Sequence, residues 1–316
     1  MKSFVPPSYP VEILLDTDMA GDCDDAGALA VLHNLAREGA ARIRAIVVNN
    51  TDIASLEAVA AINAYYGRSD IPLGMYLGTG IGNSPGNFVQ ALADDSRQYG
   101  HTRFSRKNVS PAVFVYRRAL AAISDGQAVI ASIGHLNNLH ALLFSPPDEH
   151  SPFPGVDLVR KKVAHLVVMG GDYPEGKEHN FSALGSNTIT AAAINHWPTP
   201  ILFSGYAIGL ALRTGCGLLA LPETHPVRRA YALYPARPLE NGRPSWDQTV
   251  VLAAVRGPDC FWTLSPPGIN RIATDGSNKW QPDPLGSHAY LVEKIAPKKV
   301  TVEIEALMTG DVRASF

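Results

Sequence analysis

The chain has 316 residues, and its 27 basic and 29 acidic residues give a formal net charge of −2 at pH 7. This balance offers no electrostatic argument for a nucleic acid or an anionic membrane as partner, so the function is sought in a local site. Three cysteines, Cys23, Cys216 and Cys260, lie far apart without a CxxC motif, which disfavours a disulfide framework or a zinc site. The first ten residues lack the apolar segment of a signal peptide, and no run reaches the roughly 18 apolar residues of a membrane helix. We therefore expect a soluble cytoplasmic protein.

Short apolar runs alternate with helix-like stretches along the chain. Because most of these runs are almost wholly apolar, they are typical of strands covered on both faces, as in a parallel sheet. The strand-like runs span residues 11–15, 43–48, 128–133, 164–169 and 200–204, and the helix-like stretches span residues 57–67 and 111–123. This alternation predicts an α/β fold with a mostly parallel central sheet and helices on both faces. No linker is evident, and we expect a single domain over residues 1–316.

Three other segments carry weaker patterns. Residues 221–244 are rich in Pro, Arg and Tyr and indicate a mobile flap or an insertion. Residues 145–155 are typical of a surface loop. Residues 299–308 alternate imperfectly, which favours a late strand.

Polar or glycine-rich residues follow the strand-like runs. "DTD" comes after the first, "NNTD" after the second, "GHLNN" after the third and "GGDYPEG" after the fourth. Open α/β sheets bind their ligands at the carboxyl ends of the strands. These four loops therefore predict a site at that edge of the sheet.

The first of these loops is crowded with acid. The aspartates within residues 14–32 are Asp16, Asp18, Asp22, Asp24 and Asp25. Hard cations such as Ca²⁺ or Mg²⁺ take several carboxylate oxygens, and such an ion would offset the repulsion among them. Asp24 and Asp25 have a second explanation, since carboxylates are favoured at the start of a helix. That explanation does not extend to Asp16 and Asp18, which end a strand.

Two familiar acidic motifs fit this loop less well. An EF-hand counted from Asp16 would place Ala20 and Gly27 at ligand positions, and a strand precedes the loop where a helix is required. A DxD phosphatase, with Asp16 as nucleophile, explains the first two aspartates but not "DCDD". The phosphatase remains an alternative.

"DTDMAGDCDDAGALA" resembles the N-terminal signature of the inosine-uridine preferring nucleoside hydrolase family. Other segments are similar to family motifs and follow in the family's order: "IGHLNNL" (133–139), "VVMGGD" (167–172), "EHN" (178–180) and "SWDQTVVLAAV" (245–255). The resemblance runs from about residue 11 to residue 256. It implies a Rossmann-like nucleoside hydrolase fold and Ca²⁺-dependent hydrolysis of the N-glycosidic bond of ribonucleosides, which gives ribose and a free base.

The resemblance also implies roles for individual residues. Ca²⁺ would be held by Asp18, Asp25, Asp247 and the backbone carbonyl of Ile133. Asp18 would in addition take a proton from the attacking water as general base. Asp24 and Asn180 would act on the ribose in catalysis, and Glu178 would bind it. Alternation along the strand gives Asp16 the facing of Asp18 one pleat lower, so we expect Asp16 to support the site from beneath.

Two further sugar contacts are implied with departures from the family pattern. Asp172 stands where the family has an asparagine that contacts the 5′-hydroxyl, so an acceptor is kept and a donor is lost. Asp52 is the counterpart of a ribose-binding residue on the second strand, with Asn50 as the alternative because the loop length differs.

Departures near the nucleobase favour purines. Many members have a histidine immediately before the last metal aspartate, whereas this chain has Trp246, as purine-specific members do. Indole stacking on a purine is a favourable aromatic contact. The family's early histidine motif is replaced by "LGTGIGNS" (77–84), and Tyr231 and Tyr234 stand in the segment that covers the base in the family. His135 and His179 flank the site and are expected to be hydrogen-bonded neighbours rather than acids.

The same departures leave a further alternative open. A protein that keeps the metal site but has lost leaving-group activation would bind a nucleoside or ribose without cleaving it. The resemblance implies a small-molecule nucleoside partner and a homodimer or homotetramer.

Overall fold

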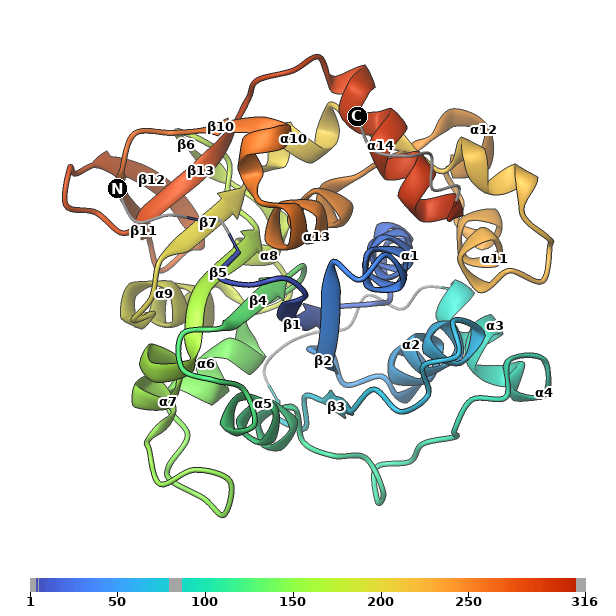
Figure 1. Ribbon diagram of the computed structural model, residues 1–316, viewed down its shortest axis with the longest axis horizontal. Coiled ribbons are helices and arrows are strands. Elements are labelled where there is room, and N and C mark those ends of the chain that lie inside the picture. Colours follow the sequence, from blue (N-terminus) through green and yellow to red (C-terminus); the bar gives the residue numbers. More distant parts are fainter. Residues whose placement is uncertain (1–3, 5, 80–86, 311–316) are drawn as a thin grey trace.

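The computed structural model describes residues 4, 6–79 and 87–310, in which strands and helices alternate along most of the chain (Figure 1). The strands are β1 (Val11–Thr17), β2 (Ala41–Val48), β3 (Leu73–Met75), β4 (Ala128–Ser132), β5 (Val163–Met169), β6 (Glu175–Lys177), β7 (Ile201–Ser204), β8 (Arg213–Thr214), β9 (Arg243–Pro244), β10 (Trp262–Leu264), β11 (Gly268–Ile272), β12 (Ser277–Pro282) and β13 (His288–Glu293). The α-helices are α1 (Asp24–Arg37), α2 (Ile53–Tyr65), α3 (Asn87–Asp94), α4 (Ser96–Tyr99), α5 (Ala112–Ala121), α6 (Asn137–Leu143), α7 (Gly155–Lys162), α8 (His179–Ser182), α9 (Asn187–His196), α10 (Tyr206–Leu210), α11 (Pro226–Leu233), α12 (Pro238–Asn241), α13 (Trp246–Arg256) and α14 (Pro297–Thr309). Two short 3-10 helices are η1 (Cys216–Ala220) and η2 (Pro258–Cys260).

The main sheet is parallel through its centre and antiparallel at one end. Within the described residues its strand order is β3-β2-β1-β4-β5-β7-β13-β11-β12-β6, and β10 pairs with β13. The strands from β3 to β13 in this order pair in parallel. The pairings that involve β6, β10, β11 and β12 are antiparallel. A second, two-stranded sheet joins β8 and β9.

The side chains of the central strands alternate between two cores, one on each face of the sheet. On β1, Ile13 and Leu15 belong to one core and Leu14 to the other. Helices α1, α2, α13 and α14 close the first core, and α5, α6, α7 and α9 close the second (Figure 1). Burial on both faces explains why the strand sequences are nearly all apolar.

The chain changes direction across the sheet at β1. After β1 the chain runs outward through β2 and β3, and it then returns to β4 on the other side of β1. Backbone hydrogen bonds continue past the strand ends, with the Ile133 N–H donating to the Asp16 carbonyl at 2.8 Å and the Asn49 N–H donating to the Thr17 carbonyl at 2.9 Å. The loops after β1, β2 and β4 are thereby held together at the switch point, where open α/β sheets bind ligands.

The predicted sheet and its helices on both faces are confirmed. The five strand-like runs form β1, β2, β4, β5 and β7, and the helix-like stretches overlap α2 and α5. The prediction of a strand at residues 299–308 is wrong, because this segment lies in α14. Pro297 stands in the first turn, and Val300, Ile304 and Leu307 recur at helical spacing and are buried.

The other two segments singled out from the sequence differ in their secondary structure. Residues 221–244 fold into α11, α12 and β9, and residues 145–154 form a loop before α7. In the part of the chain that the structure describes, no helix is both long and apolar enough to cross a membrane.

Candidate functional site

The loop after β1 leads directly into α1 and places two acidic residues in its first turn. Cys23 occupies the N-cap position, so Asp24 and Asp25 are the first residues inside the helix and neither of them is its cap. Both carboxylates are buried, and the positive end of the helix dipole favours negative charge there. The helix therefore tolerates these two aspartates, but capping is not what they do.

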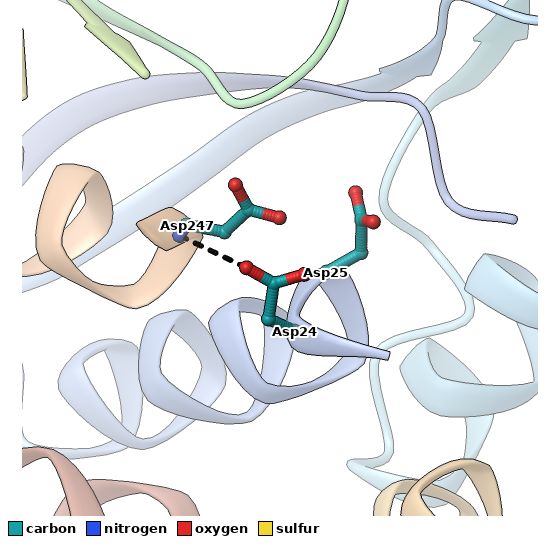
Figure 2. A group of neighbouring side chains, drawn as sticks. All are labelled: Asp24, Asp25 and Asp247. Carbon is teal, nitrogen blue, oxygen red and sulfur yellow. Dashed lines mark hydrogen bonds between the residues drawn. The ribbon is translucent and has the colours of Figure 1, made fainter. Parts of the chain in front are cut away.

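A third aspartate arrives from the far end of the chain. Asp247 lies in the first turn of α13, and α13 packs against α1 so that the two helices begin side by side (Figure 2). The Asp247 backbone N–H donates a 3.4 Å hydrogen bond to Oδ2 of Asp24. Carboxylate oxygens of Asp24, Asp25 and Asp247 all lie within 4.8 Å of one another. Two helix N-termini thus direct three carboxylates into one space, as Figure 2 shows.

This cluster is electrostatically unfavourable without a cation. Burial, followed by the charge of Asp22, raises the pKa of Asp24 well above its usual value. Burial and the neighbouring aspartates likewise raise the pKa values of Asp25 and Asp247. The Thr17 hydroxyl, which donates to Asp25 Oδ1, offsets part of that repulsion. The charge of Arg243 lowers the pKa of Asp24 only in part. Three buried carboxylates that repel one another in this way fit a hard divalent cation.

Asp18 lines the same cavity on the side of the loop after β4. Its side chain is 24% exposed, and its Oδ2 lies 3.9 Å from Nε2 of His135. Burial is the largest influence on Asp18 and raises its pKa, while His135 and His179 lower it. A Cβ at Gly134 would lie 2.6 Å from Oδ1 of Asp18, so only glycine leaves room for this carboxylate.

Asp16 lies beneath this group and is not among the cavity walls. It is fully buried and accepts hydrogen bonds from the Tyr116 hydroxyl at 2.9 Å, Asn49 at 2.9 Å and Asn138 at 3.2 Å. Burial raises the pKa of Asp16 to about 7, against the effect of these donors. Asp16 therefore fixes the ends of β1, β2 and β4 to one another and offers no free oxygen to a substrate.

The loop after β5 supplies a second polar wall. Glu178 caps α8, with Oε1 accepting from the Asn180 N–H at 2.8 Å and Oε2 accepting from the Gly171 N–H at 3.2 Å. Burial raises the pKa of Glu178 to about 7. The Asn180 side chain donates to the Met169 carbonyl at 3.3 Å, and the Asn180 carbonyl contacts Nδ1 of His135 at 3.1 Å. Both side chains line the cavity in orientations fixed by backbone contacts.

Aromatic side chains and the Arg243 guanidinium form the other end of the cavity. Trp246 stacks on Tyr206 at a centroid distance of 5.5 Å and donates its indole N–H to the Tyr206 carbonyl at 2.9 Å. The Arg243 guanidinium lies 5.2 Å from the Trp246 ring centroid and pairs with Asp22 through both carboxylate oxygens. Neither Arg243 nor a separate role for Asp22 was predicted from the sequence. Arg243 stands three residues before Trp246, which was predicted to stack on the base, and this spacing could have marked Arg243 as a neighbour of the base.

Apart from Asp16 and Thr17, these groups surround one cavity of about 290 Å³ at the carboxyl edge of the sheet. Its walls are Asp18, Gly21, Asp22, Asp24, Asp25, Asn50, Ile133, His135, Met169, Glu178, His179, Asn180, Leu184, Tyr206, Arg243, Trp246 and Asp247. One region is acidic, one is amide- and carboxylate-lined, and one is aromatic. Such a division suits a ligand with a metal-binding diol at one end and a flat ring at the other.

Solved structures with the same architecture include two nucleoside hydrolases. An inosine-uridine preferring nucleoside hydrolase from Bacillus anthracis superposes with a TM-score of 0.71 and 14% identity, over 95% of this chain and 99% of that one. A plant nucleoside hydrolase gives a TM-score of 0.70 and 18% identity, also over 95% and 99%. The chain has the nucleoside hydrolase fold.

A protein outside the named hydrolases has this fold too. The type III effector protein XopQ, whose structure was solved with adenosine diphosphate ribose, gives a TM-score of 0.70 and 16% identity over 97% of this chain and 96% of that one. By sequence, neither a protein-family model nor a curated protein matches the chain.

Within the nucleoside hydrolase fold, most residues singled out from the sequence lie around the cavity. The predicted metal ligands Asp18, Asp25, Ile133 and Asp247 all line it. The cluster with the shortest separations contains Asp24 in place of Asp18. Asp24 was expected on the ribose, so the structure places it nearer to the other carboxylates than the sequence suggested.

Four other predicted contacts lie away from the cavity walls of this nucleoside hydrolase fold. Asp52 caps α2 by accepting from the Ala54 N–H, and Asn50 lines the cavity instead. The Asp172 carboxylate accepts from the Tyr173 N–H. Tyr231 is fully buried, and its hydroxyl accepts from Gln248 at 2.9 Å. Tyr234 lies beside the cavity wall Arg243, whose Cζ atom is 5.0 Å from its ring centroid. Of the segment 77–84, residues 80–84 lie outside the described residues.

Proposed function

We propose that this protein is a Ca²⁺-dependent nucleoside N-ribohydrolase that favours purine nucleosides. The observation that carries the proposal is the joining of Asp25 and Asp247 in one buried acidic cluster, in a cavity that also holds Glu178 and Asn180. The likeness to nucleoside hydrolase structures supports the fold on which this arrangement depends.

In this proposal the cation is held by Asp25, Asp247, Asp18 and the Ile133 carbonyl. Bound there, Ca²⁺ supplies Lewis acidity that polarises water and the hydroxyls of a sugar. Asp24 lies beside these ligands and accepts a hydrogen bond from a ribose hydroxyl. Glu178 and Asn180 hold the other side of the sugar, with their orientations set by the Gly171 and Met169 backbone.

Cleavage of an N-glycosidic bond passes through a transition state with oxocarbenium character. A water oxygen forms a bond to C1′ while the bond from C1′ to the base nitrogen breaks and its electron pair leaves with the base. Asp18, which is partly exposed to the cavity, takes the proton of the water. The carboxylates around the sugar stabilise the positive charge that develops on the ring.

The phosphatase alternative is disfavoured by the position of Asp16. A nucleophilic carboxylate needs an oxygen that faces the substrate, whereas Asp16 is fully buried and its oxygens accept three hydrogen bonds. Measurement of base release distinguishes a hydrolase from the other alternative, a protein that binds nucleosides without cleaving them.

The test measures base release from inosine, guanosine, adenosine, uridine and cytidine, with Ca²⁺ and with a chelator. We expect release from purine nucleosides that requires Ca²⁺ and is lost in Asp247→Asn. Asp259→Asn, which changes an exposed carboxylate beyond the end of α13, is the matched control and should keep full activity. Calorimetric binding of inosine without base release would identify a binder, and hydrolysis of uridine but not inosine would contradict the purine preference.

A further inference from the structure

At the aromatic end of the cavity, the Arg243 guanidinium uses only some of its N–H donors in hydrogen bonds to the described residues. An arginine carries five N–H donors in a planar fork and stays protonated at all relevant pH values. In Arg243, Nε and Nη2 donate to the Asp22 carboxylate, which occupies the side edge of the guanidinium. The end edge, with Nη1 and the second N–H of Nη2, makes no hydrogen bond to any residue that the structure describes.

The position of this free edge is fixed by its surroundings. Asp22 holds the guanidinium from one side, and the rings of Tyr234 and Trp246 lie 5.0 and 5.2 Å from its Cζ atom. Arg243, Trp246 and Tyr206 all line the cavity. A flat ring that binds beside these aromatic side chains with its edge toward Arg243 would therefore meet a pair of held donors.

We propose that Arg243 recognises the leaving base and selects 6-oxopurines, a proposal that rests on the proposed function of the same site. A 6-oxopurine such as guanine presents two adjacent acceptors, O6 and N7, which match two parallel N–H donors. Adenine replaces the O6 acceptor with an N6 amino donor, which would face the guanidinium donor-to-donor. Pyrimidines lack the adjacent pair. Inosine and guanosine are thus the matched substrates, and adenosine, uridine and cytidine are not.

The same contact assists departure of the base. When the bond from C1′ to N9 breaks, the electron pair spreads over the purine ring, and O6 and N7 gain negative charge. The guanidinium stabilises this charge without giving up a proton, while the proton of the attacking water goes to Asp18. The released base then takes its own proton from solvent. Because the guanidinium stabilises the leaving base and Asp18 accepts the proton, no histidine is needed at the position of Trp246.

The test compares Arg243→Ala and Arg243→Lys with the wild type on inosine, adenosine and p-nitrophenyl β-D-ribofuranoside. Nitrophenolate leaves as a stable anion and has no purine edge. We expect kcat/KM for inosine to fall on the order of 10²-fold in Arg243→Ala, the size of effect seen on removal of one preorganised donor to a developing anion. The nitrophenyl riboside should change less than about 3-fold, which is within ordinary surface effects. Arg243→Lys keeps the charge but loses the fork, so it should recover little of the preference for inosine over adenosine.

Arg237→Ala is the matched control, because Arg237 lies on the same segment and pairs with Glu240 at an exposed position. The Ca²⁺-induced rise in melting temperature, if retained, shows that the Arg243 variants have an intact metal loop. Equal losses on inosine and on the nitrophenyl riboside would overturn the inference, as would an unchanged ratio of inosine to adenosine.

A second readout separates failure of this inference from failure of the proposed function. Calorimetry with free hypoxanthine and free adenine should show tighter binding of hypoxanthine, lost in Arg243→Ala. If the wild type cleaves no riboside, the hydrolase proposal fails, yet binding that depends on Arg243 would still support base recognition. Equal binding of the two bases would overturn that recognition whether or not turnover is seen.

Discussion

Asp25 and Asp247 come from helices near opposite ends of the chain, and their carboxylate oxygens lie within 4.8 Å of each other. Burial and neighbouring carboxylates raise both pKa values. A carboxyl group with a raised folded pKa contributes stability below its unfolded value of about 4, and this contribution is lost as the pH rises through the folded pKa. The close approach therefore costs the metal-free protein stability at neutral and higher pH.

The first prediction is that Ca²⁺ stabilises the protein more at about pH 8 than at about pH 5, because protons and the cation compete for the same oxygens. A ligand at 100 times its dissociation constant adds about 2.7 kcal/mol to the free energy of unfolding. Thermal unfolding with Ca²⁺ and with chelator, at both pH values, measures the effect. A cation effect that is equal at both pH values, or that persists in Asp247→Asn, would contradict it.

The second prediction concerns Gly134, which lies beside the carboxylate of the proposed general base, Asp18. A methyl group at position 134 would lie 2.6 Å from Oδ1 of Asp18 and 2.8 Å from Nδ2 of Asn49. Gly134→Ala should therefore displace Asp18 and lower kcat on inosine at least ~10²-fold, the lower end of what a general base contributes. The check is a double-mutant cycle with Asp18→Asn at saturating Ca²⁺. Since both changes remove the same function, the double variant should be no slower than Asp18→Asn, and multiplicative losses would refute the coupling.

Much of the sheet and most of the site followed from the sequence, for a shared physical reason. Parallel strands are buried on both faces, so they stand out as apolar runs, and the residues just after them must meet at one edge. Asp18, Asp25, Ile133 and Asp247 were placed around one cavity by motif order together with this topology.

The parts that could not be foreseen depend on long-range packing. Arg243 meets Asp22 across 221 positions, and no local periodicity signals such a pair. Tyr231 was expected over the base, but it lies on the face of α11 that packs into the core with Val227 and Ala230. In residues 299–308 the imperfect alternation of apolar and polar residues suggested a strand. The helix limits, Pro297 at the start and Gly310 in a left-handed conformation at the end, were the better signal.

The third prediction separates a structural from a nucleophilic role for Asp16. Asp16→Asn leaves one acceptor oxygen and turns an amide N–H₂ toward donors from Tyr116, Asn49 and Asn138. An unsatisfied buried group costs about 1–3 kcal/mol, so the variant should be destabilised yet still release base. Burial raises the pKa of Asp16 to about 7. In the wild type, its contribution to the free energy of unfolding is therefore fully present below the pKa of the unfolded chain and declines as the pH rises through about 7.

Urea unfolding in the presence of chelator checks this sign. The deficit of Asp16→Asn relative to wild type should be larger at about pH 5 than at about pH 8, because ionisation of the buried carboxyl removes part of its contribution in the wild type. Complete loss of turnover in a well-folded variant, together with a trapped phosphoryl adduct in the wild type, would instead support the phosphatase alternative.

The fourth prediction concerns Glu178, whose two oxygens accept backbone hydrogen bonds from Asn180 and Gly171 and retain lone pairs for a sugar hydroxyl. Burial raises the pKa of Glu178 to about 7, so the acceptor-only form becomes populated as the pH rises through that value. KM for inosine should then decrease from about pH 6 to about pH 8 in the wild type, with this dependence absent in Glu178→Gln. The variant also loses a charged hydrogen bond, which is worth about 1.5–3 kcal/mol. Its KM should therefore rise by roughly one to two orders of magnitude, with a smaller change in kcat.

Glu175→Gln, an exposed change on β6 beside the same loop, provides the control. A pH profile that survives in Glu178→Gln would assign the titration to another group and remove Glu178 from the ribose site.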